Sequence, residues 1–87
     1  MREVHKAKAE FVNRYVQPML EAADPKIRSC VYTTTETGRR VIAESVIVTR
    51  EQRDFTEKTT EINVTGDSEK ALLLDVVKAM AKEWRIA

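Results

Sequence analysis

The chain has 87 residues, of which 43% are hydrophobic and 33% are charged, and its 15 Lys and Arg against 14 Asp and Glu leave a net charge of +1. This length suits one domain, so we expect residues 1–87 to form a single small domain. The balanced charge argues against a general nucleic-acid coat protein, because such binding relies on clustered Lys and Arg that neutralise phosphates.

The numbers of cysteines and glycines and the length of the apolar runs indicate the compartment of the protein and exclude several kinds of site. The only cysteine is Cys30, so no intrachain disulfide can form, which fits a reducing compartment. No apolar run approaches the roughly 20 residues that span a bilayer, and the first residues lack the apolar core of a secretory signal. We therefore expect a cytoplasmic protein with no membrane partner. One cysteine and one histidine make no metal signature, and two glycines make no phosphate-cradling loop, so we expect no metal and no cofactor.

Residues 3–23 have the periodicity of a helix. Apolar side chains recur at steps of three and four residues, which is typical of a helix with one buried stripe. Pro18 lacks a backbone donor, so we expect a kink near Arg14. Asp24-Pro25 should end the helix. We expect the stripe to contain Val4, Ala7, Phe11, Tyr15 and Met19, widened by Val12, Val16 and Leu20.

Two strands are predicted over residues 27–36 and 39–50, which are rich in β-branched side chains. A turn at Thr37-Gly38 would join them as a tight hairpin, because glycine accepts a positive φ; a loop longer by a residue or two is the alternative. The tight turn sets a register that places Glu44 opposite Val31. Since side chains alternate between faces, this register assigns to the core Ile27, Val31, Ile42, Val46 and Val48.

A third strand is predicted over residues 55–65, and a final helix begins after Gly66, where Asp67 or Ser68 can cap it. We expect a two-layer α+β fold in the order helix–three-stranded antiparallel sheet–helix (αβββα), with both helices on one sheet face. One helix on each face is the alternative. The buried stripe of the final helix is expected to contain Leu73, Val76, Val77, Met80 and Trp84, with Leu72 and Ala81 beside it.

The sheet face opposite the predicted core is too apolar for a fully solvated surface, and exposed apolar patches tend to mark interfaces. A two-fold dimer that stacks its sheets would bury this face. The sequence therefore favours a non-catalytic interaction or assembly module that forms a homodimer or binds a protein partner. The expected contact residues are Cys30, Tyr32, Val41, Ala43 and Ile47.

Three residues were considered for chemistry. A carboxylate buried at Glu44 would have a raised pKa and could serve as an acid or base, but a slipped register or a place at the sheet margin is the favoured explanation. His5 is interpreted as a solvated residue of the first helical turn, and Cys30 as a small apolar filler. We expect no catalytic residues and no enzyme; a site assembled across a dimer from Glu44, Tyr32, Cys30 or His5 is the weaker alternative.

Four arginines are the candidates for binding nucleic acid. Arg39 and Arg40 flank the hairpin tip, and Arg50 and Arg53 lie near the next connection. Basic loop tips can contact phosphates. A solvated surface of mixed charge is favoured, because acids stand beside these arginines at Glu36, Glu51 and Asp54.

The order helix–three strands–helix resembles that of double-stranded RNA-binding domains over most of the chain. The resemblance implies nucleic-acid binding as an alternative function, through the Arg39/Arg40 hairpin. Those domains carry a Lys-rich cluster at the start of the second helix and a histidine in the first strand connection. Here the second helix opens Asp67-Ser68-Glu69-Lys70, and the connection Thr37-Gly38 has no histidine.

Overall fold

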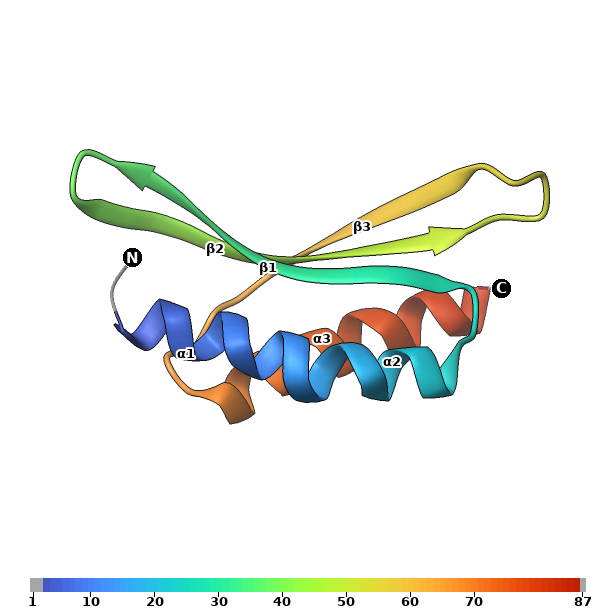
Figure 1. Ribbon diagram of the computed structural model, residues 1–87, viewed down its shortest axis with the longest axis horizontal. Coiled ribbons are helices and arrows are strands. Elements are labelled where there is room, and N and C mark those ends of the chain that lie inside the picture. The colour runs from blue at the N-terminus through green and yellow to red at the C-terminus, as the bar shows by residue number, and fades with distance from the viewer. Residues whose placement is uncertain (1–2, 87) are drawn as a thin grey trace.

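All helical segments lie on one face of a three-stranded antiparallel sheet in the computed structural model, which describes the backbone of residues 3–86 and the side chains of residues 3–84 (Figure 1). The strands are adjacent in the order β1-β2-β3. The expected two-layer α+β fold, with both helices on one sheet face, is confirmed. The elements are α1 (Glu3–Phe11), η1 (Val12–Val16), α2 (Gln17–Ala23), β1 (Ile27–Thr37), β2 (Arg40–Glu51), β3 (Glu57–Asn63) and α3 (Glu69–Ile86).

The first three segments form one continuous helix with a wider π-helical turn, η1, in its middle. The backbone N–H of Gln17 donates to the carbonyl oxygen of Val12, five residues earlier, instead of four. Pro18 has no N–H to offer the carbonyl of Arg14, and a π turn just before it accommodates the missing bond. The sequence predicted a kink near Arg14, and the structure has a π turn over Val12–Val16 at this place.

The π turn decides which side of this helix is buried. Lys8, Val12, Val16 and Leu20 follow one another at four-residue steps, and all four are buried. In a regular helix of 3.6 residues per turn such a series drifts around the axis, but the wider turn brings it back toward the sheet. The predicted stripe is therefore displaced around the helix. Four of its expected core members are exposed instead: Val4, Ala7, Tyr15 and Met19.

The β1–β2 hairpin turns at Gly38-Arg39, one residue later than predicted. Thr37 pairs with Arg40, and Gly38 has a φ of 63°, which suits the first central position of a tight hairpin turn. A bulge between Thr35 and Glu36 adds a further register shift. As a result Tyr32 lies opposite Val46, where the predicted register placed it opposite Ala43. The displacement is odd, so it exchanges the two faces of β1 relative to β2.

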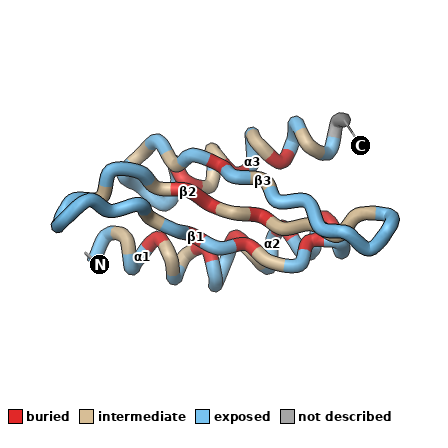
Figure 2. Tube along the Cα trace, turned by 90° about the horizontal axis from the view of Figure 1, so that it is seen from above, coloured by how far each residue is buried: buried red, intermediate tan, exposed pale blue. Residues whose placement is uncertain are grey.

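The core face of the sheet is therefore only partly the predicted one. Val46 and Val48 are buried as expected, but their neighbours on β1 are Cys30 and Tyr32, which are buried as well. Figure 2 shows in red the buried positions of the sheet and of the helix layer. The prediction that Cys30 and Tyr32 lie on the exposed face is wrong. The core placement of two other residues is also wrong, since Val31 is 51% exposed and Ile42 is 61% exposed.

The last helix, α3, begins as predicted. Ser68 Oγ accepts a hydrogen bond from the backbone N–H of Ala71 at 3.1 Å, which is the geometry of an N-cap. Its buried series is Leu72, Val76 and Met80, which the sequence placed in the buried stripe or beside it. Three other residues expected there are exposed: Val77, Ala81 and Trp84. Within residues 3–86, no helix is both long and apolar enough to cross a membrane.

Candidate functional site

A polar cluster joins α1 to the sheet. Lys8 Nζ donates to Glu44 Oε1 at 2.7 Å and to the carbonyl oxygen of Gly66 at 3.0 Å. The Tyr32 hydroxyl donates to the same Glu44 oxygen at 2.5 Å and lies 2.9 Å from His5 Nδ1. Glu44 thus faces the helices, as predicted, although the register is slipped: Glu44 pairs with Thr34 and not with Val31. The structure brings together Glu44, Tyr32 and His5, three of the four residues named for a site across a dimer.

Lys8 is the member of this cluster that sequence reasoning missed. It lies four residues before Val12, so it belongs to the buried series of the helix. Burying an ammonium group without a partner is costly, and the Glu44 carboxylate supplies the partner. A lysine in phase with the apolar series, together with a carboxylate on the inward face of β2, is the sequence signal that could have identified the pair.

Glu44 is ionised in this cluster and Tyr32 is neutral. Burial alone would raise the pKa of the Glu44 carboxyl, but hydrogen bonds from Lys8 and Tyr32, and the charge of Lys8, hold that pKa below its usual range. Burial, followed by the bond to the Glu44 carboxylate, raises the pKa of the Tyr32 phenol well above its ordinary value. Acid–base catalysis works best with a pKa near the operating pH, so these shifts suit a structural network.

A shallow hollow of about 330 Å³ lies beside the cluster and is lined by His5, Arg40, Val41, Glu44 and Asp67. Its charges are of both signs and come from β2 and the segment before α3. Among the described residues, no three His, Cys, Asp or Glu side chains are grouped to hold a metal ion. In the same part of the chain, every fully buried side-chain nitrogen and oxygen has a hydrogen-bond partner.

A second polar cluster holds the opposite end of the helix layer. Asp24 Oδ2 accepts hydrogen bonds from Arg50 Nε at 2.5 Å and from Trp84 Nε1 at 3.3 Å. Burial raises the pKa of Asp24, but the hydrogen bonds and the charge of Arg50 outweigh it and hold that pKa below its usual range. The cluster ties the end of α2 to β2 and α3. Arg50 is engaged in an ion pair here, so it is poorly placed to contact a phosphate.

Cys30 is fully buried among the helices and strands. Burial, followed by the charge of Glu21, raises the pKa of its thiol to about 11. A reactive cysteine needs a lowered pKa and access to solvent. The interpretation of Cys30 as a small apolar filler is confirmed by its position.

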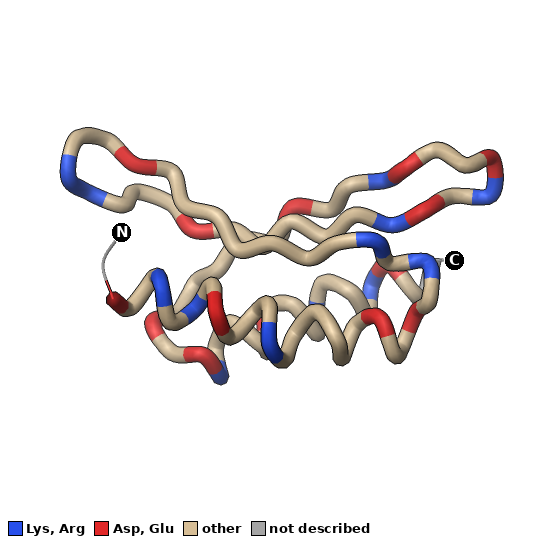
Figure 3. The backbone as a smooth tube through the Cα atoms, viewed as in Figure 1, with Lys and Arg blue, Asp and Glu red and all other residues tan. Residues whose placement is uncertain are grey.

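The remaining arginines do not form one basic surface. Arg39 and Arg40 lie at the β1–β2 tip, and Arg53 lies at the β2–β3 tip, at the opposite end of a molecule 41 Å long (Figure 3). Acidic residues accompany both tips. A surface that neutralises several adjacent phosphates is therefore not assembled by these side chains.

The uncovered sheet face is less apolar than predicted, because Cys30 and Tyr32 lie on the other side. Val31, Ala43 and Ile47 remain on it. An antiparallel sheet commonly leaves one face in water, and threonines occupy much of this one. Contact of Val41, Ala43 and Ile47 with a partner stays a prediction. The threonines of this face are Thr33, Thr35, Thr49 and Thr59.

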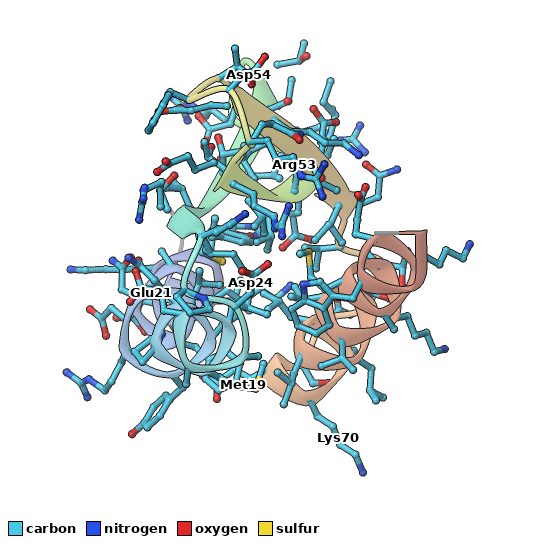
Figure 4. The ribbon with its side chains drawn as sticks, turned by 90° about the vertical axis from the view of Figure 1, so that its right-hand side faces the viewer. Met19, Glu21, Asp24, Arg53, Asp54 and Lys70 are labelled. Atoms are coloured by element: carbon cyan, nitrogen blue, oxygen red, sulfur yellow. The ribbon has the colours of Figure 1, made fainter. Side chains whose placement is uncertain are left out.

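A second apolar surface lies on the helix layer. Tyr15 and Met19 follow Phe11 at four-residue steps, and the rings of Phe11 and Tyr15 are 5.7 Å apart. Met19 lies on the side of the helix layer away from the sheet (Figure 4). On α3, Val77 follows Leu73 at the same spacing. We call the following set the helix stripe: Phe11, Tyr15, Met19, Leu73, Leu74 and Val77.

The helix stripe is substantially open to solvent. Tyr15 is 60% exposed and Leu74 is 49% exposed. Phe11 and Leu73 are partly buried against the core, so they connect the stripe to the interior. A hollow of about 130 Å³ between α1 and the start of α3 is lined by Phe11 and Tyr15 together with Glu69. Sequence reasoning missed this surface because it assigned most of these side chains to the core.

No known protein family matches the chain, and neither curated proteins nor solved structures include one with detectable similarity to it. The surfaces of the molecule itself therefore carry its functional interpretation.

Proposed function

We propose that this protein is a non-catalytic assembly module that self-associates through the helix stripe. The observation that carries the proposal is the exposure of Tyr15, Met19, Leu74 and Val77 on the helix layer. Large apolar patches on small proteins tend to mark interfaces. A chain of this size also hides a smaller fraction of its surface on folding than a larger domain does, so a second copy would add useful apolar burial.

The charges at the borders of the helix stripe suit a second copy of the chain. Glu10 on α1 and Arg14 in η1 are exposed, and Lys70 and Lys78 are exposed on α3. Glu69 is also exposed at the start of α3, so both borders carry charges of both signs, and a two-fold axis can bring opposite charges of the two copies together. Helices with apolar side chains at four-residue steps also pack by ridges into grooves. The partner is therefore proposed to be the chain itself.

The non-catalytic part of the proposal is supported by the state of the polar groups. Glu44 is ionised and paired, the Tyr32 phenol is neutral, and the Cys30 thiol is buried with a raised pKa. The nucleic-acid alternative is not favoured, because the arginines are split between two ends and an ion pair. A cytoplasmic location is proposed on the free thiol of Cys30.

Analytical ultracentrifugation over a series of protein concentrations tests this function. We expect wild type to sediment as a species larger than one chain, in an amount that grows with concentration. The double variant Tyr15→Glu/Leu74→Glu should associate more weakly, because it places charges in the helix stripe. Phe55→Glu is the matched control, since Phe55 is 87% exposed at the β2–β3 tip and lies outside the stripe.

Circular dichroism should show that all three proteins keep the same secondary structure. A wild type that stays a single chain at every concentration would overturn the proposal. So would a stripe variant that associates as strongly as wild type.

A further inference from the structure

The two edges of the sheet differ in their charge. Within the described residues β1 and β3 are the outer strands, and each pairs with β2 alone. The β3 edge carries Glu57, Lys58 and Glu61, and charges of this kind protect an edge from pairing with another chain. The β1 edge has no charge, proline or glycine from Ser29 to Thr35. Only the β3 edge is protected in this way.

The helices beneath the two edges also differ in charge. The hollow between β3 and α3 is lined by several charged side chains, among them Asp75, Lys78 and Glu83. Under β1, the helix places Ala9 against the core, and Asn13 and Gln17 follow it at four-residue steps. These two amides carry no charge. The next residue at this spacing is Glu21, which is charged and accepts a hydrogen bond from Gln17, so the uncharged stretch below β1 ends at Gln17.

The ends of the uncharged segment are complementary. Arg28 precedes it and Glu36 follows it, and each is four positions from Tyr32. When a strand pairs antiparallel with a copy of itself about a two-fold axis at Tyr32, Arg28 of each copy comes opposite Glu36 of the other, at the place where β1 is irregular between Ile27 and Ser29. Opposite charges at facing positions stabilise such a pair, and like charges destabilise it. Arg28 already bonds to Glu51 within its own chain and has half of its side chain exposed.

We propose that β1 pairs with β1 of a second copy, in antiparallel register about Tyr32, so that two sheets join into one. The pairing is self-complementary, as a two-fold interface requires. It gives backbone partners to the outer N–H and C=O groups of β1, which is how an open sheet edge recruits a strand. It also places Val31 of each copy opposite Thr33 of the other, in β-branched cross-strand pairs.

This inference goes beyond the proposed helix-stripe contact, because it uses a different surface and can hold without that contact. The experiment therefore starts from the stripe variant Tyr15→Glu/Leu74→Glu, in which the first contact is weakened. Sedimentation of this variant should still show a dimer. Adding Thr33→Lys to it should give a single chain, because a lysine on an edge strand opposes pairing. Adding Thr59→Lys instead, on the β3 edge, should leave the dimer intact.

Charge reversal tests the register. In the same background, Arg28→Glu or Glu36→Arg alone should raise the dimer dissociation constant roughly tenfold, because each places like charges opposite one another at two symmetric positions. The combined reversal Arg28→Glu/Glu36→Arg should restore the dimer toward its starting affinity. Thermal unfolding of each variant at low concentration checks that the single chain remains folded.

The outcomes separate the two proposals. If wild type associates and the stripe variant is a single chain, the β1 pairing is overturned and the helix-stripe function stands. A stripe-variant dimer that ignores Thr33→Lys also overturns the pairing. If the combined reversal raises the dimer dissociation constant as much as a single reversal does, the register about Tyr32 is overturned. A stripe variant that matches wild type but dissociates with Thr33→Lys supports the pairing and overturns the stripe.

Discussion

Lys8 and Glu44 are 36 positions apart in the sequence, yet Lys8 Nζ lies 2.7 Å from Glu44 Oε1. The pair joins α1 to β2 inside the molecule, and the carbonyl of Gly66 adds the segment before α3 to the same ammonium group. Three parts of the chain therefore meet at one buried charge.

Removing one member of this ion pair should destabilise the folded protein. Lys8→Met should lower the free energy of unfolding by about 3 kcal/mol, since it leaves the Glu44 carboxylate without its ion partner. Lys8→Met/Glu44→Gln should recover more than half of that loss, because no unpaired charge remains and the carbonyl of the introduced amide can still accept from Tyr32. Urea unfolding followed by circular dichroism measures both. A double variant no more stable than Lys8→Met would contradict the ion-pair explanation.

Acid should destabilise the fold through Glu44 and Asp24. Both have a folded pKa below their ordinary values of 4.5 and 3.8. The stabilising contribution of such a group is complete above its unfolded pKa and is lost as the pH falls through its folded pKa. The free energy of unfolding should thus decline from about pH 4.5 downward. Glu44→Gln should make this decline shallower, whereas Glu36→Gln, at an exposed position, should leave it unchanged in urea titrations at successive pH values.

The Cys30 thiol should be unreactive in the folded protein. It is buried, and its pKa of about 11 leaves little thiolate at neutral pH. An aromatic disulfide reagent should therefore label it at the rate of unfolding, and denaturant should make labelling immediate. The control is Cys30→Ala/Thr33→Cys, which moves the thiol to an exposed site and should react at once. Equal labelling rates in the two folded proteins would show that Cys30 is accessible.

Phe55 stores backbone strain at the β2–β3 tip. It has a φ of 66°, a conformation that costs a non-glycine residue about 1–2 kcal/mol, and its side chain is almost wholly exposed. Phe55→Gly should raise the free energy of unfolding by about 1 kcal/mol, after the entropy of the added glycine is taken into account. Phe55→Ala keeps the strain and should give little gain. Thermal unfolding that ranks alanine above glycine would contradict this account.

Gly66 is required by a close approach to α3. A Cβ at this position would lie 2.4 Å from the Cβ of Ala71, which is too near for two carbons. Gly66→Ala should therefore lower the free energy of unfolding by about 2 kcal/mol, as overpacking commonly does. Gly66→Ala/Ala71→Gly should recover part of the loss, although glycine inside a helix has its own cost. If the second change brings no recovery in chemical unfolding, steric contact is not the cause.

Local patterns in the sequence were sufficient for the order and approximate bounds of the elements. The end of the first helix at Asp24-Pro25, the Ser68 cap and the placement of Val46 and Val48 on the inward face all follow from short-range signals. A cap needs only a side-chain oxygen and a nearby N–H. Alternation needs only neighbouring residues in one strand.

The face of β1 was decided by tertiary structure. The turn at Gly38-Arg39 and the bulge after Thr35 together displace the pairing by an odd number of residues, and an odd displacement reverses the faces. Several turn positions are compatible with the same sequence. The register that forms is the one in which Cys30 and Tyr32 pack against the helices.

Tertiary structure also decided which apolar residues remain on the surface. The π turn at Val12–Val16 rotates the first helix so that Val12, Val16 and Leu20 face the sheet, and this leaves Tyr15 and Met19 outside. Helical periodicity specifies that a stripe exists, but several apolar residues lie within reach of it. Only one series of helix side chains packs against the sheet. Lys8 can belong to this buried series because its ammonium group pairs with Glu44.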